Sequence, residues 1–297
     1  MAHLSNRRAL LIVNPNARGG GEFGPAIRSI LEDGGISIIE KSPTKDESIS
    51  DIIRNNQAVD LVIVAGGDGS LNAAAKGILE TRLPLAILPM GTANDFARTI
   101  GIPADPLKAA RELLAYKPYP VDLGEVNGHP FFNVASVGFS ADLAQQLNAD
   151  AKRKFGKLGY AVVAARILWR SDLFTAYLEH EGTTEKISTL QVSVGNGKFY
   201  GGGMAIKQDA KIDDGLLDIY SLEVDHWWKL LKFLPSLRQG TQAKWEDVRA
   251  FSATELIIKT KKPRPVNTDG ELTSWTPAHF KVRLKAIEVF RPDPSYY

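Results

Sequence analysis

The stretch VAGGDGSLNAAAKGILE, residues 64–80, places three glycines and an aspartate between an apolar run and a run with helical character. The apolar run LVIVA (61–65) predicts a buried strand, and residues 70–79 predict a helix. In an α/β sheet, ligands bind beyond the carboxyl ends of the strands, which is where this turn lies. Glycines let a ligand approach the backbone closely, and the free N–H groups of a helix start suit phosphate.

Asp68 adds a negative charge to this turn. A lone carboxylate repels bound phosphates unless a cation lies between them, so Asp68 points to Mg²⁺. We expect Ser70 to cap the following helix. On this motif alone, a plain strand-to-helix turn with a solvated aspartate is an equal alternative, because the stretch matches neither GxxxxGK[ST] nor GxGxxG.

Two further loops rich in small and polar residues follow predicted strands. VNPNARGGG (13–21) comes after ALLIV (9–13), and ILPMGTANDFAR (87–98) contains the end of LAILP (85–89). Parallel strands end at a common edge of a sheet, so we expect these loops to lie beside GGDG. Thr92 and Asn94 are candidate donors to phosphate oxygens, and Asp95 is a second candidate near a metal.

The chain divides into two parts by its pattern. Residues 1–125 alternate apolar strands with helices, which predicts a parallel sheet covered on both faces. Residues 126–297 are mostly strand-like and predict an antiparallel β domain, with the last strand a candidate to return to the first domain. Within it, residues 279–285 alternate, so Phe280, Val282 and Leu284 are expected on one face. A site in the cleft between the domains is expected.

Composition narrows the class of protein. The chain has 297 residues, of which 44% are hydrophobic and 24% are charged, so it can form one large or two ordinary domains. A net charge of +2 gives no reason to expect nucleic acid as a partner. The absence of cysteine excludes disulfides and thiolate chemistry and is compatible with the cytoplasm. No apolar run approaches the roughly 18 residues of a membrane-spanning helix.

NPNARGGG, GGDGS and PMGTANDFAR, in this order and spacing, resemble the nucleotide-binding half of the bacterial diacylglycerol kinase and lipid kinase family. That family is related to sphingosine and ceramide kinases and, more distantly, to NAD kinases and phosphofructokinases. The resemblance covers essentially the whole chain, through VDLGEVNG (121–128), FFNVASVGFSADL (131–143), GNGKFYGGGM (195–204), AKIDDGLLDIYSL (210–222) and VNTDGELT (266–273). It implies an α/β nucleotide-binding domain like that of NAD kinases and phosphofructokinases, followed by a mostly antiparallel β-sandwich.

The resemblance implies Mg²⁺- and ATP-dependent phosphorylation of a hydroxyl on a lipid such as diacylglycerol or phosphatidylglycerol. The implied nucleotide site comprises Asn14, Pro15, Asn16, Arg18, Thr44, Gly66, Gly67, Asp68, Gly69, Ser70, Asn72, Gly91, Thr92, Asn94 and Asp95. The chain departs from the family pattern at three points. Ala17-Arg18 stands where the family has Ser-Gly, Ser70 replaces a threonine but keeps its hydroxyl, and Ala73 replaces an acidic residue.

The segment VNTDGE contains the candidate general base. On the residues alone, Asp269-Gly270 between two β-like runs favours a hairpin turn. The resemblance implies instead that DGE lies in the cleft and supplies the base that accepts the proton of the acceptor hydroxyl. We favour Asp269 as the base. Glu271 is an interchangeable candidate, because residues two apart on an extended segment can share a face, and the sequence does not separate them.

The acidic segment AKIDDGLLD (210–218) reads, on its residues alone, as a solvated turn before a strand. The resemblance implies a structural Mg²⁺ held by the Asp214 side chain and the carbonyl oxygens of Lys211 and Leu216. Oxygen ligands of this kind suit a hard cation. Asp122, in VDLG, is then expected to link this metal to the active site and Asp68.

Two segments are candidates for contact with a lipid surface. Residues 227–237 combine aromatic and leucine side chains with two lysines, and KRKFGK (152–157) is a basic cluster. A packed helix and a solvated face are the respective alternatives. We expect ATP, a lipid substrate and a peripheral membrane surface as partners, with a homodimer left open. The competing functions are a kinase of a small soluble alcohol and an inactive nucleotide- or lipid-binding module.

Overall fold

The structure is a computed structural model that describes residues 4, 6–14, 20–146, 173–207, 209–224, 236, 239–241 and 245–296. Some residues of the sequence analysis lie outside the described residues. These are Pro15, Asn16, Ala17 and Arg18 of the first loop, the basic cluster 152–157, and most of the segment 227–237.

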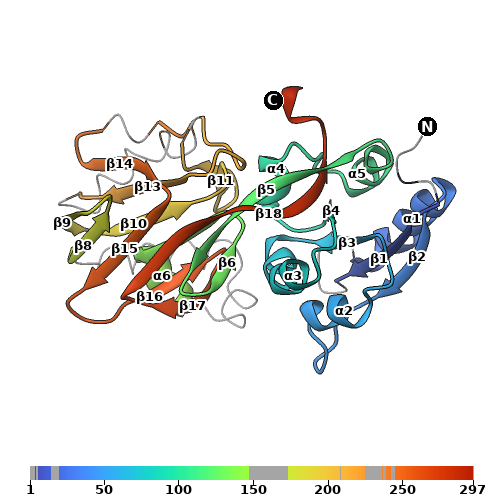
Figure 1. The fold of residues 1–297 in the computed structure, drawn as a ribbon, viewed down its shortest axis with the longest axis horizontal. Coiled ribbons are helices and arrows are strands. Elements are labelled where there is room, and N and C mark those ends of the chain that lie inside the picture. Colours follow the sequence, from blue (N-terminus) through green and yellow to red (C-terminus); the bar gives the residue numbers. More distant parts are fainter. Residues whose placement is uncertain are drawn as a thin grey trace.

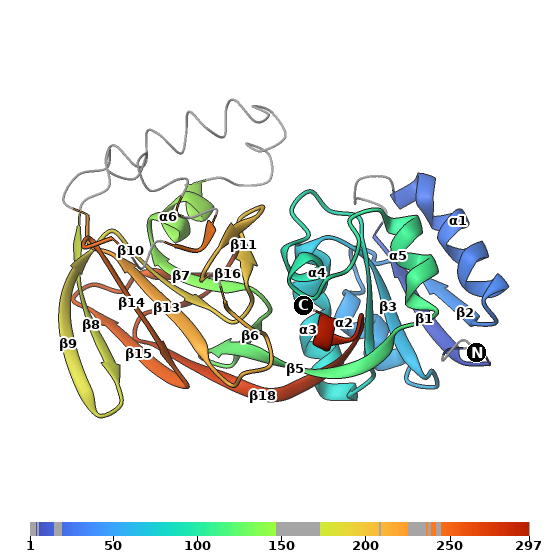
Figure 2. The same ribbon diagram turned by 90° about the horizontal axis from the view of Figure 1, so that it is seen from above.

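The first part of the chain forms a parallel sheet covered by helices on both faces. Strands β1 (Arg8–Val13), β2 (Ser37–Lys41), β3 (Leu61–Gly66) and β4 (Leu85–Pro89) lie in the order β2-β1-β3-β4. Helices α1 (Gly20–Asp33) and α5 (Pro106–Leu113) cover one face, and α2 (Ile49–Asn55) and α3 (Asp68–Thr81) cover the other (Figures 1 and 2). The predicted α/β arrangement is confirmed, and burial on both faces explains the continuous apolar strands.

The starts of helices α2 and α3 differ in how they are capped. Helix α2 begins at Ile49, because Ser48 and Asp51 form a capping box at its N-terminus. Helix α3 begins at Asp68 with Gly67 as its N-cap, so the prediction that Ser70 caps it is wrong. Gly67 has no side chain to bond the first N–H groups of α3, which leaves them available to a ligand.

The second part of the chain is a pair of sheets, with a short α6 (Phe139–Gln146) and a 3₁₀ turn, η2 (Pro294–Tyr296). A six-stranded antiparallel sheet has the order β14-β13-β10-β7-β16-β17. Its strands are β7 (Val134–Gly138), β10 (Gln191–Gly195), β13 (Leu217–Leu222), β14 (Val248–Ala253), β16 (Pro265–Thr268) and β17 (Glu271–Trp275). Side chains such as Phe131, Val192 and Phe280 fill the core against the facing sheet, so the predicted antiparallel β-sandwich is confirmed.

The facing sheet is continuous with the parallel sheet of the first part. Its strands are β5 (Lys117–Val126), β6 (His129–Phe131), β8 (Phe174–His180), β9 (Thr183–Thr189), β15 (Glu255–Thr260) and β18 (Ala278–Arg291). A two-stranded ribbon of β11 (Phe199–Tyr200) and β12 (Met204–Ala205) projects from the second part, and α4 (Asp95–Thr99) lies beside it (Figure 1).

The long last strand joins the two parts. β18 pairs with β15 and β5, and Val289 pairs in parallel with Leu85 of β4 (Figure 1). Its pairing with β5 shifts between Arg283 and Ile287, where Lys285 has a φ of +46°. Phe280 is buried, but Leu284 is 67% exposed, so the prediction of one apolar face through Leu284 is wrong at that residue. The bulge ends the alternation on which the prediction depended.

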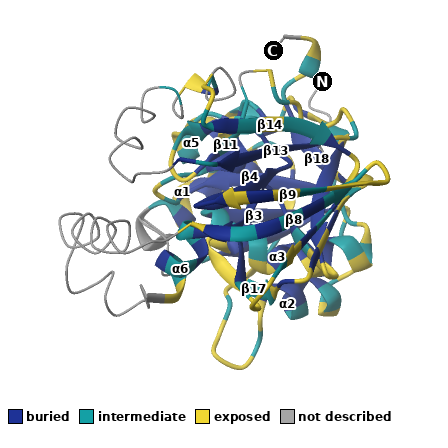
Figure 3. Cartoon of the chain, turned by 90° about the vertical axis from the view of Figure 1, so that its left-hand side faces the viewer, coloured by how far each residue is buried: buried dark blue, intermediate teal, exposed yellow. Residues whose placement is uncertain are grey.

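Exposure differs strongly between strands of the second part (Figure 3). β13 is buried along its whole length, whereas β9 and β17 carry exposed residues. Within the part of the chain that the structure describes, no helix has both the length and the apolar character needed to cross a bilayer.

Candidate active site

The turns after β3 and β4 lie against each other through two glycines. A Cβ atom on Gly91 would lie 2.6 Å from the Gly67 Cα and 2.6 Å from Asn94 Oδ1. Asn94 fixes this contact, because its Oδ1 accepts the Gly91 N–H at 2.8 Å and its Nδ2 donates to the Gly91 carbonyl at 3.0 Å. The structure therefore brings GGDG and GTAND together, with Thr92 exposed beside them.

Asp68 lies in the first turn of α3, at the uncapped helix start. One carboxylate oxygen, Oδ1, accepts the backbone N–H of Phe96 at 3.2 Å, which ties the start of α4 to the start of α3. The free N–H groups of α3 suit phosphate, and carboxylate oxygens are ligands that Mg²⁺ prefers. Asp68 therefore has the surroundings of a carboxylate that holds a cation beside phosphates.

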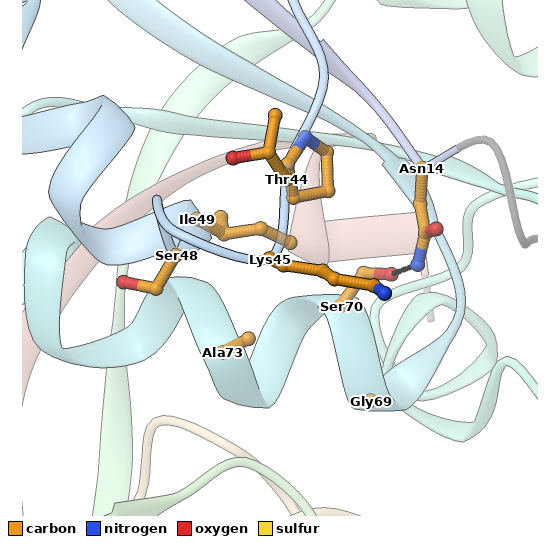
Figure 4. Close-up of a pocket in the computed structure, with 9 residues that line it drawn as sticks. Asn14, Thr44, Lys45, Ser48, Ile49, Gly69, Ser70 and Ala73 are labelled. Carbon is orange, nitrogen blue, oxygen red and sulfur yellow. Dashed lines mark hydrogen bonds between the residues drawn. The ribbon is translucent and has the colours of Figure 1, made fainter.

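Asn14 and Ser70 connect the end of β1 to α3. The Asn14 Nδ2 donates to the Ser70 Oγ at 2.9 Å (Figure 4). Ser70 is buried, and a Cβ on Gly66 would lie 2.5 Å from its Oγ. The Ser70 hydroxyl thus serves the contact with Asn14 and not the predicted helix cap.

A pocket of about 470 Å³ opens beside the start of α3 (Figure 4). Its volume is in the range of small-molecule sites. Thr44 shapes one wall, because its Oγ1 accepts the N–H groups of Asp46 at 3.3 Å and Glu47 at 3.2 Å. The lining consists of Asn14, Pro43, Thr44, Lys45, Ser48, Ile49, Gly69, Ser70 and Ala73.

Lys45 is a pocket residue that the sequence analysis missed. Of the nine residues that line the pocket, Lys45 alone is charged, and its side chain extends toward Asn14 and Ser70 (Figure 4). The sequence did indicate this position. The loop that holds Lys45 follows β2, so it begins at the same edge of the sheet as the other loops.

Asp269 occupies the turn between β16 and β17. Asp269 and Gly270 have φ values of +50° and +97°, so the hairpin interpretation of this segment holds. The carboxylate also accepts three backbone bonds, from Phe132 to Oδ2 at 2.7 Å and from Asn133 and Val134 to Oδ1 at 3.0 Å each. Burial raises the pKa of Asp269 to about 6, although these N–H groups oppose the rise.

Glu271 reaches the first part of the chain. It is exposed at the start of β17, and its Oε2 accepts a hydrogen bond from Asn72 Nδ2 at 3.3 Å. Asn72 lies on α3, one turn beyond Asp68. A second contact nearby is the edge-on packing of Phe96 against Phe132, with ring centroids 4.7 Å apart. The structure therefore brings the DGE segment to the glycine-rich loops.

Asp95 is directed toward the second part of the chain. It is only 4% exposed, and its Oδ2 accepts the Gly202 N–H at 2.8 Å, in the turn between β11 and β12. Burial raises the pKa of Asp95, and the Gly202 bond opposes that rise. Thr99, four residues further on, accepts the Phe199 N–H at 3.2 Å. Asp95 thus connects GTAND to the β11–β12 ribbon.

Asp122 holds the acidic turn in place. Its Oδ2 accepts the Gly215 N–H at 2.9 Å, and its Oδ1 accepts the Lys285 N–H at 2.6 Å. Asn196, which the sequence analysis did not single out, donates from Nδ2 to the carbonyls of Asp122 and Phe132 at 3.0 Å each. Asn196 therefore connects the acidic turn to the segment that binds the Asp269 carboxylate.

Asp214 lies in this turn with its Oδ1 accepting the Leu216 N–H at 3.1 Å. Burial raises the pKa of Asp214, and the carboxylates of Asp218 and Asp122 add to the rise. No three histidine, aspartate or glutamate side chains cluster as metal ligands among the described residues. A cation would relieve the repulsion between these carboxylates, and carboxylate oxygens such as those of Asp214 are ligands that Mg²⁺ prefers.

Two family models match the chain. The diacylglycerol kinase catalytic domain matches residues 8–126, and the YegS C-terminal NAD kinase beta sandwich-like domain matches residues 133–291.

Individual proteins and a solved structure agree with these matches. A probable lipid kinase YegS-like of Pseudomonas savastanoi pv. phaseolicola is 34% identical over 247 residues, which cover 79% of this chain and 76% of that relative. A diacylglycerol kinase of Bacillus subtilis is 28% identical over 236 residues, covering 78% of each chain. The crystal structure of a diacylglycerol kinase from Bacillus anthracis str. Sterne is similar with a TM-score of 0.80 and 27% identity, covering 98% of this chain and 99% of that one.

Proposed function

The chain belongs to the family of lipid kinases with a diacylglycerol kinase catalytic domain, and on that premise we propose that it phosphorylates a hydroxyl of a membrane lipid such as diacylglycerol or phosphatidylglycerol. It is a phosphotransferase, and the kinase family implies ATP as the donor. We divide it into a nucleotide-binding domain, residues 1–125, and a lipid-binding domain, residues 126–297, with β18 contributing to the sheets of both.

Helix α3 carries the main support for this proposal. Its uncapped start lies at the Gly67–Gly91 contact, beside the pocket, and its second turn contacts Glu271 through Asn72. A triphosphate with its end at this helix start lies within reach of the DGE segment. Donor and acceptor sides of the reaction therefore meet on one rigid element.

The nucleotide binds along the loops of the first domain in this proposal. Asn14, Thr44 and the residues from Gly66 to Ser70 surround the pocket and the helix start, and the Lys45 ammonium faces the negative charge of the nucleotide. The uncapped N–H groups of α3 bind phosphate oxygens.

Asp269 is the general base in the proposed reaction. It accepts the proton of the lipid hydroxyl while that oxygen forms a bond to the γ-phosphorus. The bond from the γ-phosphorus to the oxygen bridging to the β-phosphate breaks, and ADP leaves. A pKa of about 6 supports this role, because the carboxylate is mostly ionised near neutral pH yet remains basic. Glu271 is the alternative base and, in contact with Asn72, orients the acceptor.

Mg²⁺ has two places in this proposal. Asp68 would hold an ion that neutralises the charge of the phosphates, and Asp214 with the carbonyl oxygens of Lys211 and Leu216 would hold one that stabilises the acidic turn. Asp122 and Asn196 connect that turn to Phe132, which donates its N–H to Asp269.

The test is transfer of radiolabelled γ-phosphate from ATP to two panels of acceptors. One panel contains lipids in mixed micelles, and the other contains soluble alcohols in buffer. We expect label in one lipid class, lost without Mg²⁺ and lost in Asp68→Ala and Asp269→Asn, while Lys108→Ala on the outer helix α5 keeps it. Label only in soluble alcohols would contradict the lipid proposal. ATP binding without transfer to any acceptor would identify an inactive binding module.

A further inference from the structure

Strand β17 exposes two large apolar side chains. Leu272 is 40% exposed and Trp275 is 52% exposed. β17 is an edge strand of its sheet, since β16 is its only partner among the described strands. Residues three apart on a regular strand point to opposite faces, so Leu272 and Trp275 would not form one surface without a change of register.

A bulge supplies that change of register. Leu272 pairs with Asn267 and Trp275 pairs with Pro265, whereas Thr273 is the extra residue between them. Asn267 and Pro265 are two apart on β16 and share a face. Because paired residues of neighbouring strands point to the same side, Leu272 and Trp275 share that face as well.

This face is the outer one. Asn267 donates from Nδ2 to the carbonyl of Ser140 in α6 at 3.4 Å, which places it on the side of the sheet that carries α6. Val266, the residue between Asn267 and Pro265, points the other way into the core of the β-sandwich. Leu272 and Trp275 therefore point away from the core.

Basic residues adjoin Trp275. The connection from β15 to β16 contains Lys261 and Lys262, both exposed, followed by Arg264. Two hydrogen bonds, one of them to a side chain, fix this connection to the residue after Trp275. Thr276 N–H donates to the Arg264 carbonyl, and Arg264 N–H donates to the Thr276 side-chain Oγ1, both at 2.9 Å. Arg264 forms an ion pair with Asp142 at 3.4 Å, so the two lysines carry the positive charge here.

We propose that this surface, formed by Leu272, Trp275, Lys261 and Lys262, docks the enzyme onto a bilayer that contains anionic phospholipid. The proposal rests on the proposed function, because a kinase of membrane lipids must take its substrate from a bilayer. The surface is continuous with the site. Glu271 at the site begins β17, and Trp275 follows it four residues on, about 13 Å along the strand.

The chemistry of the surface selects a bilayer as its occupant. A tryptophan ring sits well at the boundary between headgroups and acyl chains, and lysines near a membrane surface are attracted to anionic headgroups. Two apolar side chains bordered by two lysines are too small a patch for a specific protein interface, which needs roughly 800 Å² from each partner.

The test is sedimentation of the full-length protein with phosphatidylcholine vesicles, with and without phosphatidylglycerol. We expect Trp275→Ala to lower the partition coefficient roughly fivefold on both vesicle types. We expect Lys261→Ala with Lys262→Ala to lower it roughly tenfold on anionic vesicles alone, with the loss vanishing at high salt. The matched controls are Leu284→Ala, an apolar side chain 67% exposed on β18, and Lys108→Ala with Lys117→Ala. Thermal melts check that each variant folds.

The outcomes separate this inference from the proposed function. The docking surface would be overturned if the wild-type protein binds neither vesicle type, or if the variants bind vesicles as strongly as the wild type. This holds even if lipid phosphorylation is found. Vesicle binding that depends on Trp275 and the lysines, in a protein that phosphorylates no lipid, would support the surface and refute the proposed reaction. Equal losses in the control variants would also overturn the assignment to β17.

Discussion

Asn72 and Glu271, 199 residues apart in the sequence, are joined by a hydrogen bond of 3.3 Å from the Asn72 side-chain amide to Glu271 Oε2. The bond connects the helix that follows GGDG to the strand that follows the DGE turn. It therefore links the proposed donor side of the site to the acceptor side. Substitutions at these two residues test how the two sides are aligned.

We expect Asn72→Ala to lower kcat/KM roughly threefold to tenfold, because it frees the Glu271 carboxylate that orients the acceptor. Glu271→Gln is expected to lower it further. If the two act through their contact, the double variant loses less than the product of the single losses. Steady-state kinetics on all four proteins measure this coupling, and strictly multiplicative losses would refute it.

The role of Asp269 as the base predicts how kcat/KM depends on pH. A general base must be ionised to act, and the pKa of Asp269 is raised to about 6 by burial. We therefore expect kcat/KM to fall as the pH drops below about 6 and to level off above it. A pH series with lipid substrate, corrected for stability at each pH, gives the profile.

If Asp269 is the base, substitutions of the two DGE carboxylates have different effects on the rate and on its pH profile. Glu271→Gln should then keep measurable activity and the same acid limb, whereas Asp269→Asn should lose about 10²- to 10⁴-fold in rate. The reverse pattern would make Glu271 the base and leave Asp269 as the residue that holds the backbone of residues 132–134.

Gly91 has no room for a side chain. The Cβ of Gly91→Ala would lie 2.6 Å from the Cα of Gly67, so the two glycine-rich loops must separate. We expect a loss of about 1–3 kcal/mol in the free energy of unfolding and at least tenfold weaker ATP binding. The matched control for stability is Gly69→Ala, since a Cβ there meets no atom within 4 Å and alanine favours a helix. Urea melts compare the two variants, and equal losses of stability would refute the clash. Because Gly69 lines the pocket, calorimetric ATP titration compares Gly91→Ala with the wild type.

Lys45 tests where the nucleotide lies. Removing the only charged residue among those lining the pocket should raise the KM for ATP about fivefold to tenfold in Lys45→Ala, with a smaller change in kcat. Lys76→Ala, an exposed lysine on α3, serves as the control for loss of one positive charge. An unchanged KM for ATP would place the nucleotide away from this pocket.

Much of the fold was predictable because its signals are local. Apolar strands such as residues 61–65, buried on both faces, and turn residues at their ends specify a parallel sheet without reference to distant residues. The same rule placed the glycine-rich loops at one edge of that sheet. The β-sandwich followed from short strands with turn residues between them, and the Asp269-Gly270 turn was readable from two residues.

Contacts between distant segments were not readable in this way. The alternation from Phe280 should have buried Leu284, but Asp122 binds the Lys285 N–H and the strand bulges there. A bulge at Thr273 likewise brings Leu272 and Trp275 to one face, which period-two reasoning would separate. In each case extra residues on one strand, one at Thr273 and two between Arg283 and Ile287, interrupt the regular alternation of sides.

The sequence by itself determined which chemical groups are available, that is, the glycines, the carboxylates of GGDG, DGE and the acidic turn, and the order of strands and helices that carries them. The tertiary structure alone decided their environments. It surrounds the half-buried Asp269 carboxylate with three backbone N–H groups, turns Asp95 toward Gly202, and sets Asn72 against Glu271. The physical reason is that pKa, hydrogen bonding and exposure depend on neighbours in space, and these neighbours come from segments far apart in the chain.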